Sequence, residues 1–332
     1  MEKYLVVGLG SMGKRRIRCL LAMGKKKEQI LGLDLRADRR DEAEKLYGVK
    51  TVDNEKDIDF EAIKAVIVSL PPDKHFVGAK IAIDNNKPVF IEASVLSDDV
   101  AKIIDYNNHK VFVAPSYTMA FHPMVKIIKN IIKSERYGKV CNFSYHCGQY
   151  LPDWHPWEKV TDYYVGNRIT GGAREIVPFE LTWIVNLLGF PKEVKGYFIK
   201  TMELGCDIED TYICSMNFGS FAGSMIVDVV ARYAIRNLII NLEEGQIQWN
   251  WDEKKIKLYD ALNKNWIYIE QPETVHQANY NVNINENMYV EELSLFLKGI
   301  DDPVIYDNDL DKDSKVLKLL NDIEDSDGGF ER

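Results

Sequence analysis

The stretch "LVVGLGSMGKRRIRCLLAM", residues 5–23, places three glycines between a short apolar run and a helical pattern. Gly8, Gly10 and Gly13 have the G-x-G-x-x-G spacing. Gly8 permits a tight turn, Gly10 lets the backbone approach a pyrophosphate, and Gly13 lets the helix pack closely on the strand. The stretch therefore predicts a buried strand, a turn and a helix whose N-terminus faces phosphate groups.

An acidic residue follows at the distance that a dinucleotide site requires. Asp34 ends the next predicted strand, "QILGLDL", and lies 21 residues after Gly13. A carboxylate there accepts hydrogen bonds from a ribose and repels a 2′-phosphate, which favours NAD over NADP. Arg36, Arg39 and Arg40 leave the alternative open, because they could bind a 2′-phosphate or stack on adenine. The competing interpretation is a glycine-rich turn before an ordinary solvated helix. It is disfavoured because the strand, the helix and the acid occur together.

Two further apolar strands, "AVIVSLPPDKH" and "PVFIEA", flank a helical segment at residues 74–86. Alternating strands and helices predict a parallel, doubly wound α/β sheet, in which ligands bind beyond the carboxyl ends of the strands. The second strand stops abruptly at an acid, Glu92, followed by two small residues. The residues expected at the cofactor are Gly8, Gly10, Ser11, Met12, Gly13, Asp34, Arg36, Arg39, Ser69, Leu70, Pro71, Pro72, His75, Glu92, Ala93 and Tyr117.

Composition excludes several functional classes. The 332 residues are 46% apolar and can fill two domains, and their formal charge of −9 is spread without a basic patch, so nucleic acid is not an expected partner. The five cysteines form no Cys-x-x-Cys pair and follow no signal peptide, which predicts a reduced, cytoplasmic protein. No apolar run approaches the roughly 20 residues of a membrane helix.

From about residue 139 the sequence becomes rich in β-strand patterns. Turn signals at residues 217–219, 245 and 263–265 predict consecutive hairpins in a mostly antiparallel, open-faced sheet. We therefore expect a Rossmann domain at 1–120 and an α+β substrate and oligomerisation domain at 121–332. One face of this sheet needs a cover, and a second subunit is the expected one, giving a homodimer or homotetramer.

Six stretches occur in order along the chain: the glycine turn, "SLPPDKH", "IEA", "SYTMAFHP", "YLPDWHPWE" and "GGAREIVPFELTWIVNLLG". With them the chain resembles the glucose-fructose oxidoreductase, inositol dehydrogenase and rhizopine-catabolism (Gfo/Idh/MocA) family. The resemblance covers nearly the whole chain. It implies a Rossmann domain followed by an open-faced sheet, NAD or NADP as cofactor, oxidation or reduction of a sugar or cyclitol hydroxyl, and oligomers built on the sheet.

The chain departs from this family where a proton is usually handled. The resemblance implies Glu-Lys-Pro at the strand end, with a lysine that orients substrate, whereas this sequence has Glu92 followed by Ala93 and Ser94. It also implies Asp, His and Asp on the helix after "TGG". The matching positions are Ile176, Phe179 and Thr182, or Glu180 at the histidine position after a shift of one residue.

Residues that could replace these proton-handling side chains lie on that helix and on the aromatic stretch before it. A buried Glu175 with a raised pKa could act as acid or base, although Arg174 and Glu175 could equally serve the helix start. The stretch "QYLPDWHPWEKVTDYYVGNR" predicts a loop over the site, in which an ordinary structural histidine is the competing interpretation of His155. The catalytic candidates are Glu175, His155 and Tyr163, and the substrate-binding candidates are Trp154, Tyr164, Arg168, Arg174, Phe179 and Glu180.

Two other chemistries are rejected. Strand alternation would place Cys141 and Cys147 on one face, about 20 Å apart, and His146 on the other, so they predict no metal site. Ser94 is the one serine near the predicted reaction centre, and the sequence shows no base beside it and no Gly-x-Ser-x-Gly turn.

The resulting hypothesis is an NAD(P)-dependent oxidoreductase that acts on a hydroxyl or keto group of a sugar or nucleotide-linked sugar. Loss of the usual lysine, aspartate and histidine motivates two alternatives. One is an NAD-binding sensor or assembly subunit without dehydrogenase turnover. The other is redox-neutral sugar chemistry with tightly bound NAD.

Overall fold

A computed structural model describes residues 1–154, 159–273 and 285–326. The chain divides into two compact units. The first contains Met1–Thr118 and Glu286–Lys315, and the second contains Met119–Asn285 and Val316–Arg332. The first division lies next to the predicted border at residue 120, whereas the segment from Glu286 to Lys315 belongs with the N-terminal unit.

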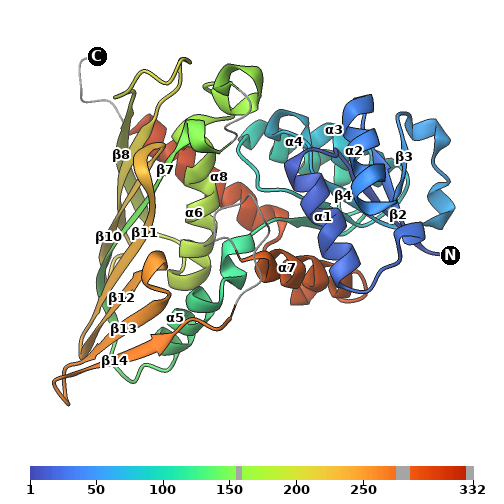
Figure 1. Ribbon diagram of the computed structural model, residues 1–332. Helices are drawn as coiled ribbons and strands as arrows, with labels where there is room; N and C mark the ends of the chain where they lie inside the picture. Colours follow the sequence, from blue (N-terminus) through green and yellow to red (C-terminus); the bar gives the residue numbers. More distant parts are fainter. Residues whose placement is uncertain (155–158, 274–284, 327–332) are drawn as a thin grey trace. The chain divides into compact units, whose positions relative to one another are not determined.

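The first unit is built on a six-stranded parallel sheet with the order β3-β2-β1-β4-β5-β6 (Figure 1). This is the doubly wound order that the alternating pattern predicts. The strands are β1 (Lys3–Val7), β2 (Ile30–Leu33), β3 (Lys50–Val52), β4 (Ile63–Val68), β5 (Val89–Ile91) and β6 (Val113–Pro115).

Helices accompany this sheet, and the apolar strands form the centre of the core. Val66, Val68 and Val89 are completely buried, as expected for strands covered on both faces. The helices of this unit are α1 (Ser11–Ala22), α2 (Ala37–Tyr47), α3 (His75–Asp84), α4 (Ser97–Asn107) and α7 (Glu286–Gly299).

Helix α7 reaches the first unit from late in the sequence and packs against α1. Its Phe296 is fully buried and contacts the rings of Phe90 and Phe112, with centroid distances of 5.7 and 5.8 Å. Glu292 is also fully buried on this helix.

The second unit is built on an eight-stranded sheet with the order β14-β13-β12-β11-β7-β10-β9-β8 (Figure 1). All neighbouring pairs are antiparallel except β7 and β10. The strands are β7 (Val140–Tyr150), β8 (Glu193–Ile199), β9 (Thr211–Asn217), β10 (Ala222–Asp228), β11 (Val230–Leu242), β12 (Gly245–Asn250), β13 (Lys255–Asp260) and β14 (Asn265–Glu270).

The prediction of consecutive hairpins is correct at the three predicted turns and wrong for one connection. β9–β10, β11–β12 and β13–β14 are antiparallel neighbours. β10 and β11 are separated by Val229 alone, yet β7 lies between them in the sheet. Because β7 comes from a much earlier part of the chain, local turn signals could not reveal this insertion.

Helix α6 (Gly172–Leu188) packs against β9 and β10, and its interior residues are almost all buried. Helices α5 (Pro123–Lys133) and α8 (Leu310–Asp325) complete the set, although only the part of α8 from Val316 onward belongs to this unit. None of the helices in the described ranges combines the length and the apolar character needed to cross a bilayer.

Candidate functional site

The glycine turn after β1 has the geometry of a phosphate cradle. Gly8 adopts φ = +89°, and a Cβ atom there would lie 2.6 Å from the Ser69 carbonyl oxygen. A Cβ at Gly13 would lie 1.8 Å from the Gly8 carbonyl oxygen, so both positions require glycine for folding. A Cβ at Gly10 would meet only the Arg39 guanidinium, 3.6 Å away. The space beside Gly10, at the N-terminus of α1, is therefore open to a ligand.

Asp34 is held in a fixed orientation next to this turn. Its Oδ2 accepts a hydrogen bond from the Leu9 amide at 2.8 Å, and its Oδ1 accepts one from the Arg36 amide at 2.9 Å. The side chain of Arg36 instead binds Asp38 on the surface, and Arg39 Nη1 lies 3.7 Å from Asp34 Oδ2. The carboxylate thus lies beside the cradle, where the sequence predicts a ribose contact.

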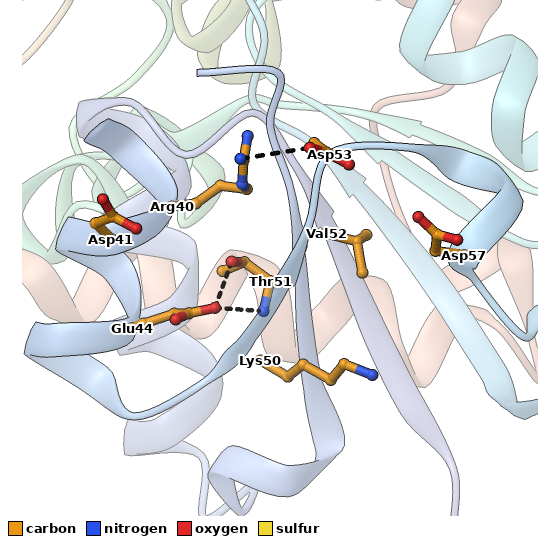
Figure 2. A pocket seen from close by; sticks show the side chains of 8 residues that line it. All are labelled: Arg40, Asp41, Glu44, Lys50, Thr51, Val52, Asp53 and Asp57. Carbon is orange, nitrogen blue, oxygen red and sulfur yellow. Dashed lines mark hydrogen bonds and ion pairs between the residues drawn. The ribbon is translucent and has the colours of Figure 1, made fainter. Parts of the chain in front are cut away.

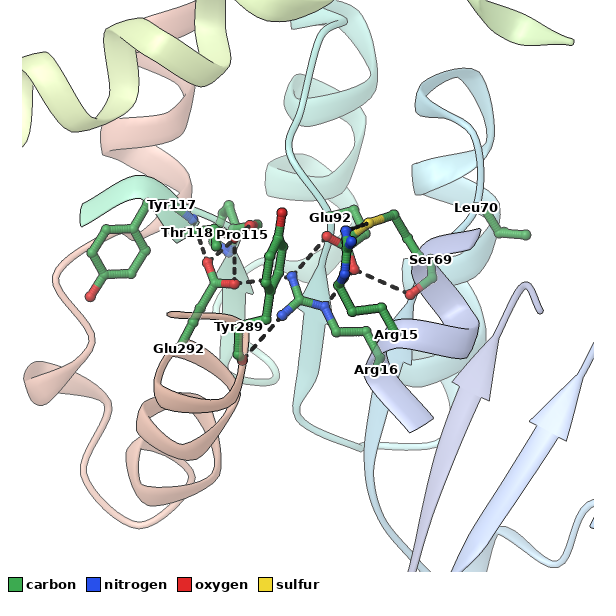
Figure 3. A network of polar contacts seen from close by, with 12 residues as sticks. Arg15, Arg16, Ser69, Leu70, Glu92, Pro115, Tyr117, Thr118, Tyr289 and Glu292 are labelled. Atoms are coloured by element: carbon green, nitrogen blue, oxygen red, sulfur yellow. Dashed lines mark hydrogen bonds and ion pairs between the residues drawn. The ribbon is translucent and has the colours of Figure 1, made fainter. Parts of the chain in front are cut away.

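A buried ion-pair network joins the strand ends to the helices (Figure 3). Arg16 on α1 is completely buried and donates to both oxygens of Glu92, at 2.6 and 2.8 Å. It also donates to Glu292 at 3.0 Å, and its guanidinium lies 4.4 Å from the centre of the Phe90 ring. Burial lowers the pKa of Arg16, but the two carboxylates outweigh it and raise this pKa well above the ordinary value.

Glu292 connects this network to the residues after β6. Its oxygens accept hydrogen bonds from the Ser116 and Thr118 hydroxyls at 2.9 and 2.7 Å, and from the Tyr117 amide at 2.7 Å. These neutral donors compensate the excess negative charge of two glutamates around one arginine. A helix from the C-terminal part of the chain therefore fixes the loop that contains the predicted cofactor residue Tyr117.

Glu92 is consequently an ion-pair partner rather than a free acid or base. Besides Arg16, it accepts a hydrogen bond from the Ser69 hydroxyl at 3.3 Å. His75, also predicted to contact the cofactor, is buried with Nε2 3.1 Å from the Leu70 carbonyl oxygen. Burial lowers the pKa of His75, so the ring is neutral near pH 7. Both side chains hold the loops at the carboxyl ends of β4 and β5.

In the second unit, Tyr164 and Glu175 form a hydrogen-bonded pair. The Tyr164 hydroxyl donates to Glu175 Oε1 at 2.6 Å. The Glu175 side chain is half-buried overall, but its Oε2 atom is buried and has no hydrogen-bond partner among the described residues. Burial raises the pKa of Glu175 to about 7, against the opposing effect of the Tyr164 hydrogen bond. The pair can therefore exchange a proton near neutral pH.

The two arginines predicted to bind an anionic substrate group are paired with carboxylates. Arg168 binds Glu209 through Nε and Nη2, and Arg174 Nε lies 2.7 Å from Glu324 Oε1. Arg174 Nη1 also donates to the Ile169 carbonyl oxygen at 2.6 Å. The bond from Arg174 to the Ile169 carbonyl oxygen supports the alternative in which Arg174 stabilises the start of α6.

Glu180, predicted to contact substrate, is instead part of the interior. Its side chain is completely buried. Its oxygens accept hydrogen bonds of 2.7 Å from the Tyr145 hydroxyl, Trp183 Nε1 and Arg236 Nη2. Burial opposes ionisation, but the Arg236 charge and these donors hold the pKa of Glu180 below its ordinary value. Both Glu180 oxygens are bonded within the interior, where they anchor α6 to the sheet.

Of the remaining candidates, the structure describes Trp154, Tyr163 and Phe179 but not His155. Trp154 is half-buried, and its Nε1 atom is buried without a hydrogen-bond partner in the described chain. Tyr163 lies edge-on to Tyr164 with ring centroids 6.2 Å apart, and Phe179 is half-buried on α6. His155 lies outside the described residues, so its predicted role stays a prediction.

The predicted faces of the β7 cysteines are wrong. Cys141 is exposed and Cys147 is buried, because the pairing with β11 shifts by one residue at Cys141. This bulge moves Cys141 off the face of Cys147. Within the described ranges, no group of three acidic, histidine or cysteine side chains has the geometry of a metal site.

A pocket of about 620 Å³ lies at the edge of the first unit, between α2 and β3 (Figure 2). Four carboxylates line it, and Val52 is the one apolar residue of its wall. Arg40 faces Asp53 at 3.5 Å and Glu44 binds Thr51, so the wall is largely satisfied internally. The acidic wall disfavours phosphate groups, and we do not assign this pocket to the cofactor. It is lined by Arg40, Asp41, Glu44, Lys50, Thr51, Val52, Asp53 and Asp57.

Three buried charged residues of the first unit were not predicted from the sequence, namely Arg16, Glu292 and Asp313. Arg16 and Glu292 each interrupt an otherwise apolar helix face, which is the signal that could have revealed them. Asp313 has no such signal in the sequence; burial raises its pKa to about 7, and the Ser94 hydroxyl opposes this rise.

Comparisons with known proteins agree with this geometry. Residues 2–104 match the family model GFO_IDH_MocA, described as an oxidoreductase family with an NAD-binding Rossmann fold. No curated protein matches the sequence of the chain.

Solved structures resemble the whole chain. A levoglucosan dehydrogenase in complex with NADH and levoglucosan has a TM-score of 0.82 at 15% identity, covering 98% of this chain and 97% of that one. An oxidoreductase from Agrobacterium radiobacter, in complex with NAD+, L-tartaric acid and magnesium, has a TM-score of 0.84 at 10% identity, with coverages of 99% and 96%. The UDP-N-acetylglucosamine 3-dehydrogenase GnnA from Acidithiobacillus ferrooxidans has a TM-score of 0.77 at 14% identity, with coverages of 98% and 97%.

At these identities the structures show a shared fold. The match to the family model adds the cofactor class for the first unit. Residues 2–104 thus match the NAD-binding Rossmann domain of the Gfo/Idh/MocA oxidoreductase family, and the chain as a whole shares its fold with these solved structures.

Proposed function

We propose that this protein is an NAD-dependent oxidoreductase that acts on a hydroxyl or keto group of a sugar or sugar nucleotide. The observation that carries the proposal is the cradle beside Gly10, with the α1 N-terminus on one side and the fixed Asp34 carboxylate on the other. Substrates of this class are named for similar structures, a levoglucosan dehydrogenase and a UDP-N-acetylglucosamine 3-dehydrogenase.

The residues present fit a nicotinamide dinucleotide. The open face of Gly10 and the α1 N-terminus would hold the pyrophosphate, and Asp34 would accept hydrogen bonds from the adenosine ribose. The bound cofactor would supply the hydride chemistry. Ser69 and the loop after β5, which the Arg16 network holds, would border its other half together with Leu70, whose carbonyl oxygen contacts His75.

We propose Glu175 as the acid or base of the second unit. Its Oε1 is oriented by the Tyr164 hydroxyl, and its Oε2 is buried without a partner in the described residues, which leaves one lone pair available for a substrate proton. A carboxyl whose pKa lies near 7 can either take or give a proton at physiological pH. His155 and Tyr163 remain further candidates from the preceding loop.

The same proposal includes self-association through the large sheet. Along β9, Tyr212, Cys214 and Met216 are buried, whereas Ile213 on the opposite face is only half-buried. We expect a second copy of the chain to cover that face. A light-scattering mass near 38.2 kDa at micromolar concentration would contradict this expectation.

The deciding experiment combines binding with turnover. Titration of purified protein with NADH should show saturable binding, and the loaded protein should then transfer hydride with at least one member of a panel of neutral sugars and UDP-sugars. Binding without any transfer across the panel would favour the sensor or assembly subunit. Retention of one equivalent of NAD through purification, with sugar conversion but no net reduction, would favour redox-neutral chemistry.

A further inference from the structure

Two arginines of the second unit lie on the same turn and helix as the Tyr164–Glu175 pair. Arg168 belongs to the turn between Tyr164 and α6, in which the Thr170 hydroxyl donates to the Tyr164 carbonyl oxygen at 3.0 Å. Arg174 directly precedes Glu175 on α6, and its Nη1 donates to a carbonyl oxygen of that turn at 2.6 Å. Both arginines are therefore tied to the segment that carries the candidate acid or base.

Arg168 is held by Glu209 through two nitrogen atoms. Its Nε donates to one carboxylate oxygen at 3.1 Å, and its Nη2 donates to the other. Glu209 is only 7% exposed, and its carbonyl oxygen accepts a hydrogen bond from the Ala173 amide at 3.2 Å, which fixes Glu209 at the start of α6. The carboxylate thus occupies the two-point edge with which an arginine would otherwise bind a phosphate.

Arg174 is held even more completely. Its Nε and Nη2 donate to the two oxygens of Glu324 at 2.7 and 3.2 Å, and its Nη1 donates to the Ile169 carbonyl oxygen. Glu324 also accepts a hydrogen bond from the Tyr212 hydroxyl at 2.9 Å. Each nitrogen of the Arg174 guanidinium therefore already has an acceptor inside the second unit.

These pairings make an anionic substrate group costly beside Glu175. A phosphate that bound Arg168 would have to break two bonds to a buried carboxylate, and it would also be repelled by Glu175 when Glu175 is ionised. The other cation in residues 159–188 is Lys159, which is exposed and screened by solvent. A neutral sugar hydroxyl meets neither cost, because it can donate to the unpartnered Glu175 Oε2.

We propose that Glu209 and Glu324 are specificity-determining residues that reserve the site at Glu175 for an uncharged sugar and exclude phosphorylated and nucleotide-linked sugars. The inference rests on the proposed oxidoreductase function and narrows its substrate class. Glu209 is the stronger determinant, because the Arg168 side chain is 52% exposed and would be available to an anion once released. Arg174 would still be held by its bond to Ile169.

The test compares kcat/KM for a free sugar with kcat/KM for its UDP-linked form. The wild type should prefer the free sugar, and Glu209→Gln should narrow that preference by about tenfold, because the released Arg168 can form a charged hydrogen bond with the diphosphate. The matched control is Glu203→Gln, which removes the same charge from an exposed pair with Lys200 and should leave the preference unchanged. Combining Arg168→Gln with Glu209→Gln should restore the wild-type preference.

A wild type that prefers the UDP-linked form, or an equal preference in the wild type and Glu209→Gln, would overturn this proposal and leave the proposed oxidoreductase intact. Absence of turnover with both forms would contradict the proposed enzyme. Calorimetry of UDP binding to the NADH-loaded protein then decides the role of Glu209. Tighter binding by Glu209→Gln than by the wild type and Glu203→Gln supports that role, and equal binding overturns it.

Thermal melting of each variant identifies any loss of fold. If Glu209→Gln does not fold, Glu324→Gln replaces it in each comparison, because this substitution releases two nitrogens of Arg174 from their carboxylate. The expected direction is the same, and an unchanged preference and unchanged UDP binding in Glu324→Gln would likewise overturn the proposal.

Discussion

Arg16 and Glu92 form a two-point ion pair inside the first unit, with nitrogen to oxygen distances of 2.6 and 2.8 Å. The pair joins α1, the helix that follows the glycine turn, to the end of β5. Glu292 extends the network to the end of β6. The loops that would border a cofactor are thereby fixed by one fully buried guanidinium.

Arg16→Met should destabilise the protein by about 3–5 kcal/mol, because it leaves Glu92 and Glu292 buried without their cation. Urea unfolding measures this difference in the free energy of unfolding. The matched control is Arg36→Met, which removes an exposed pair with Asp38 and should change stability by no more than about 0.5 kcal/mol. Equal effects of the two substitutions would show that the buried network is not a stabilising anchor.

Two glycine substitutions should separate cofactor binding from folding. Gly10→Ala adds a methyl group with no protein atom closer than 3.6 Å, so the fold should persist while NADH binding weakens by at least about tenfold. Gly13→Ala places a methyl group 1.8 Å from the Gly8 carbonyl oxygen and should prevent normal folding. Circular dichroism and fluorescence titration distinguish the two outcomes. Unchanged NADH affinity in Gly10→Ala would contradict the position assigned to the pyrophosphate.

The protein should bind NADH more tightly than NADPH, and Asp34→Asn should narrow that difference. Asparagine keeps an acceptor for the Leu9 amide but removes the negative charge that repels a 2′-phosphate. Dissociation constants for both cofactors test this directly. A wild type that prefers NADPH would reverse our interpretation and assign Arg39 and its neighbours to the 2′-phosphate.

Stability should depend on pH through Glu175. Its pKa is raised from 4.5 to about 7 in the folded protein, so the folded state holds its proton more tightly than the unfolded state. The resulting stabilisation is present below about pH 4.5 and is lost as the pH rises to about 7. Glu175→Gln should reduce this fall in unfolding free energy, by up to about 3 kcal/mol.

The pKa of Asp313 is also raised to about 7, so Asp313 lowers the unfolding free energy over the same pH range. The contribution of Glu175 is therefore measured by comparing the pH profile of Glu175→Gln with that of the wild type. Glu193→Gln, at an exposed position on β8, is the control that should leave the pH profile unchanged. Parallel profiles for the wild type and Glu175→Gln would contradict the raised pKa.

The sequence predicts the first unit well because its signals are local. Gly8, Gly10, Gly13 and Asp34 lie in consecutive elements, and the spacing alone relates them to one parallel sheet. The insertion of β7 between β10 and β11 was not predictable in this way, because it depends on pairing with a strand far away in the sequence.

Partners from distant segments explain what the sequence could not predict at the candidate site. Glu92 and Glu180 look available in the sequence, but Arg16 and Arg236 occupy their oxygens. Ser94 has no acidic partner nearby in the sequence, but in the fold its hydroxyl stabilises the carboxylate of Asp313 on α8. Local patterns identify which groups can ionise, whereas only the tertiary structure shows which of them are already paired.

The turnover of Glu175→Gln with a sugar substrate identified for the wild type decides whether Glu175 is the acid or base. We predict that kcat falls by about 10²-fold or more while the Kd for NADH is unchanged, because the substitution removes the proton-exchanging group and leaves the glycine turn intact. Tyr164→Phe should retain activity and shift the Glu175 ionisation to higher pH, because Tyr164 stabilises the anion. A Glu175→Gln enzyme that turns over within about threefold of the wild type would show that Glu175 is not the acid or base.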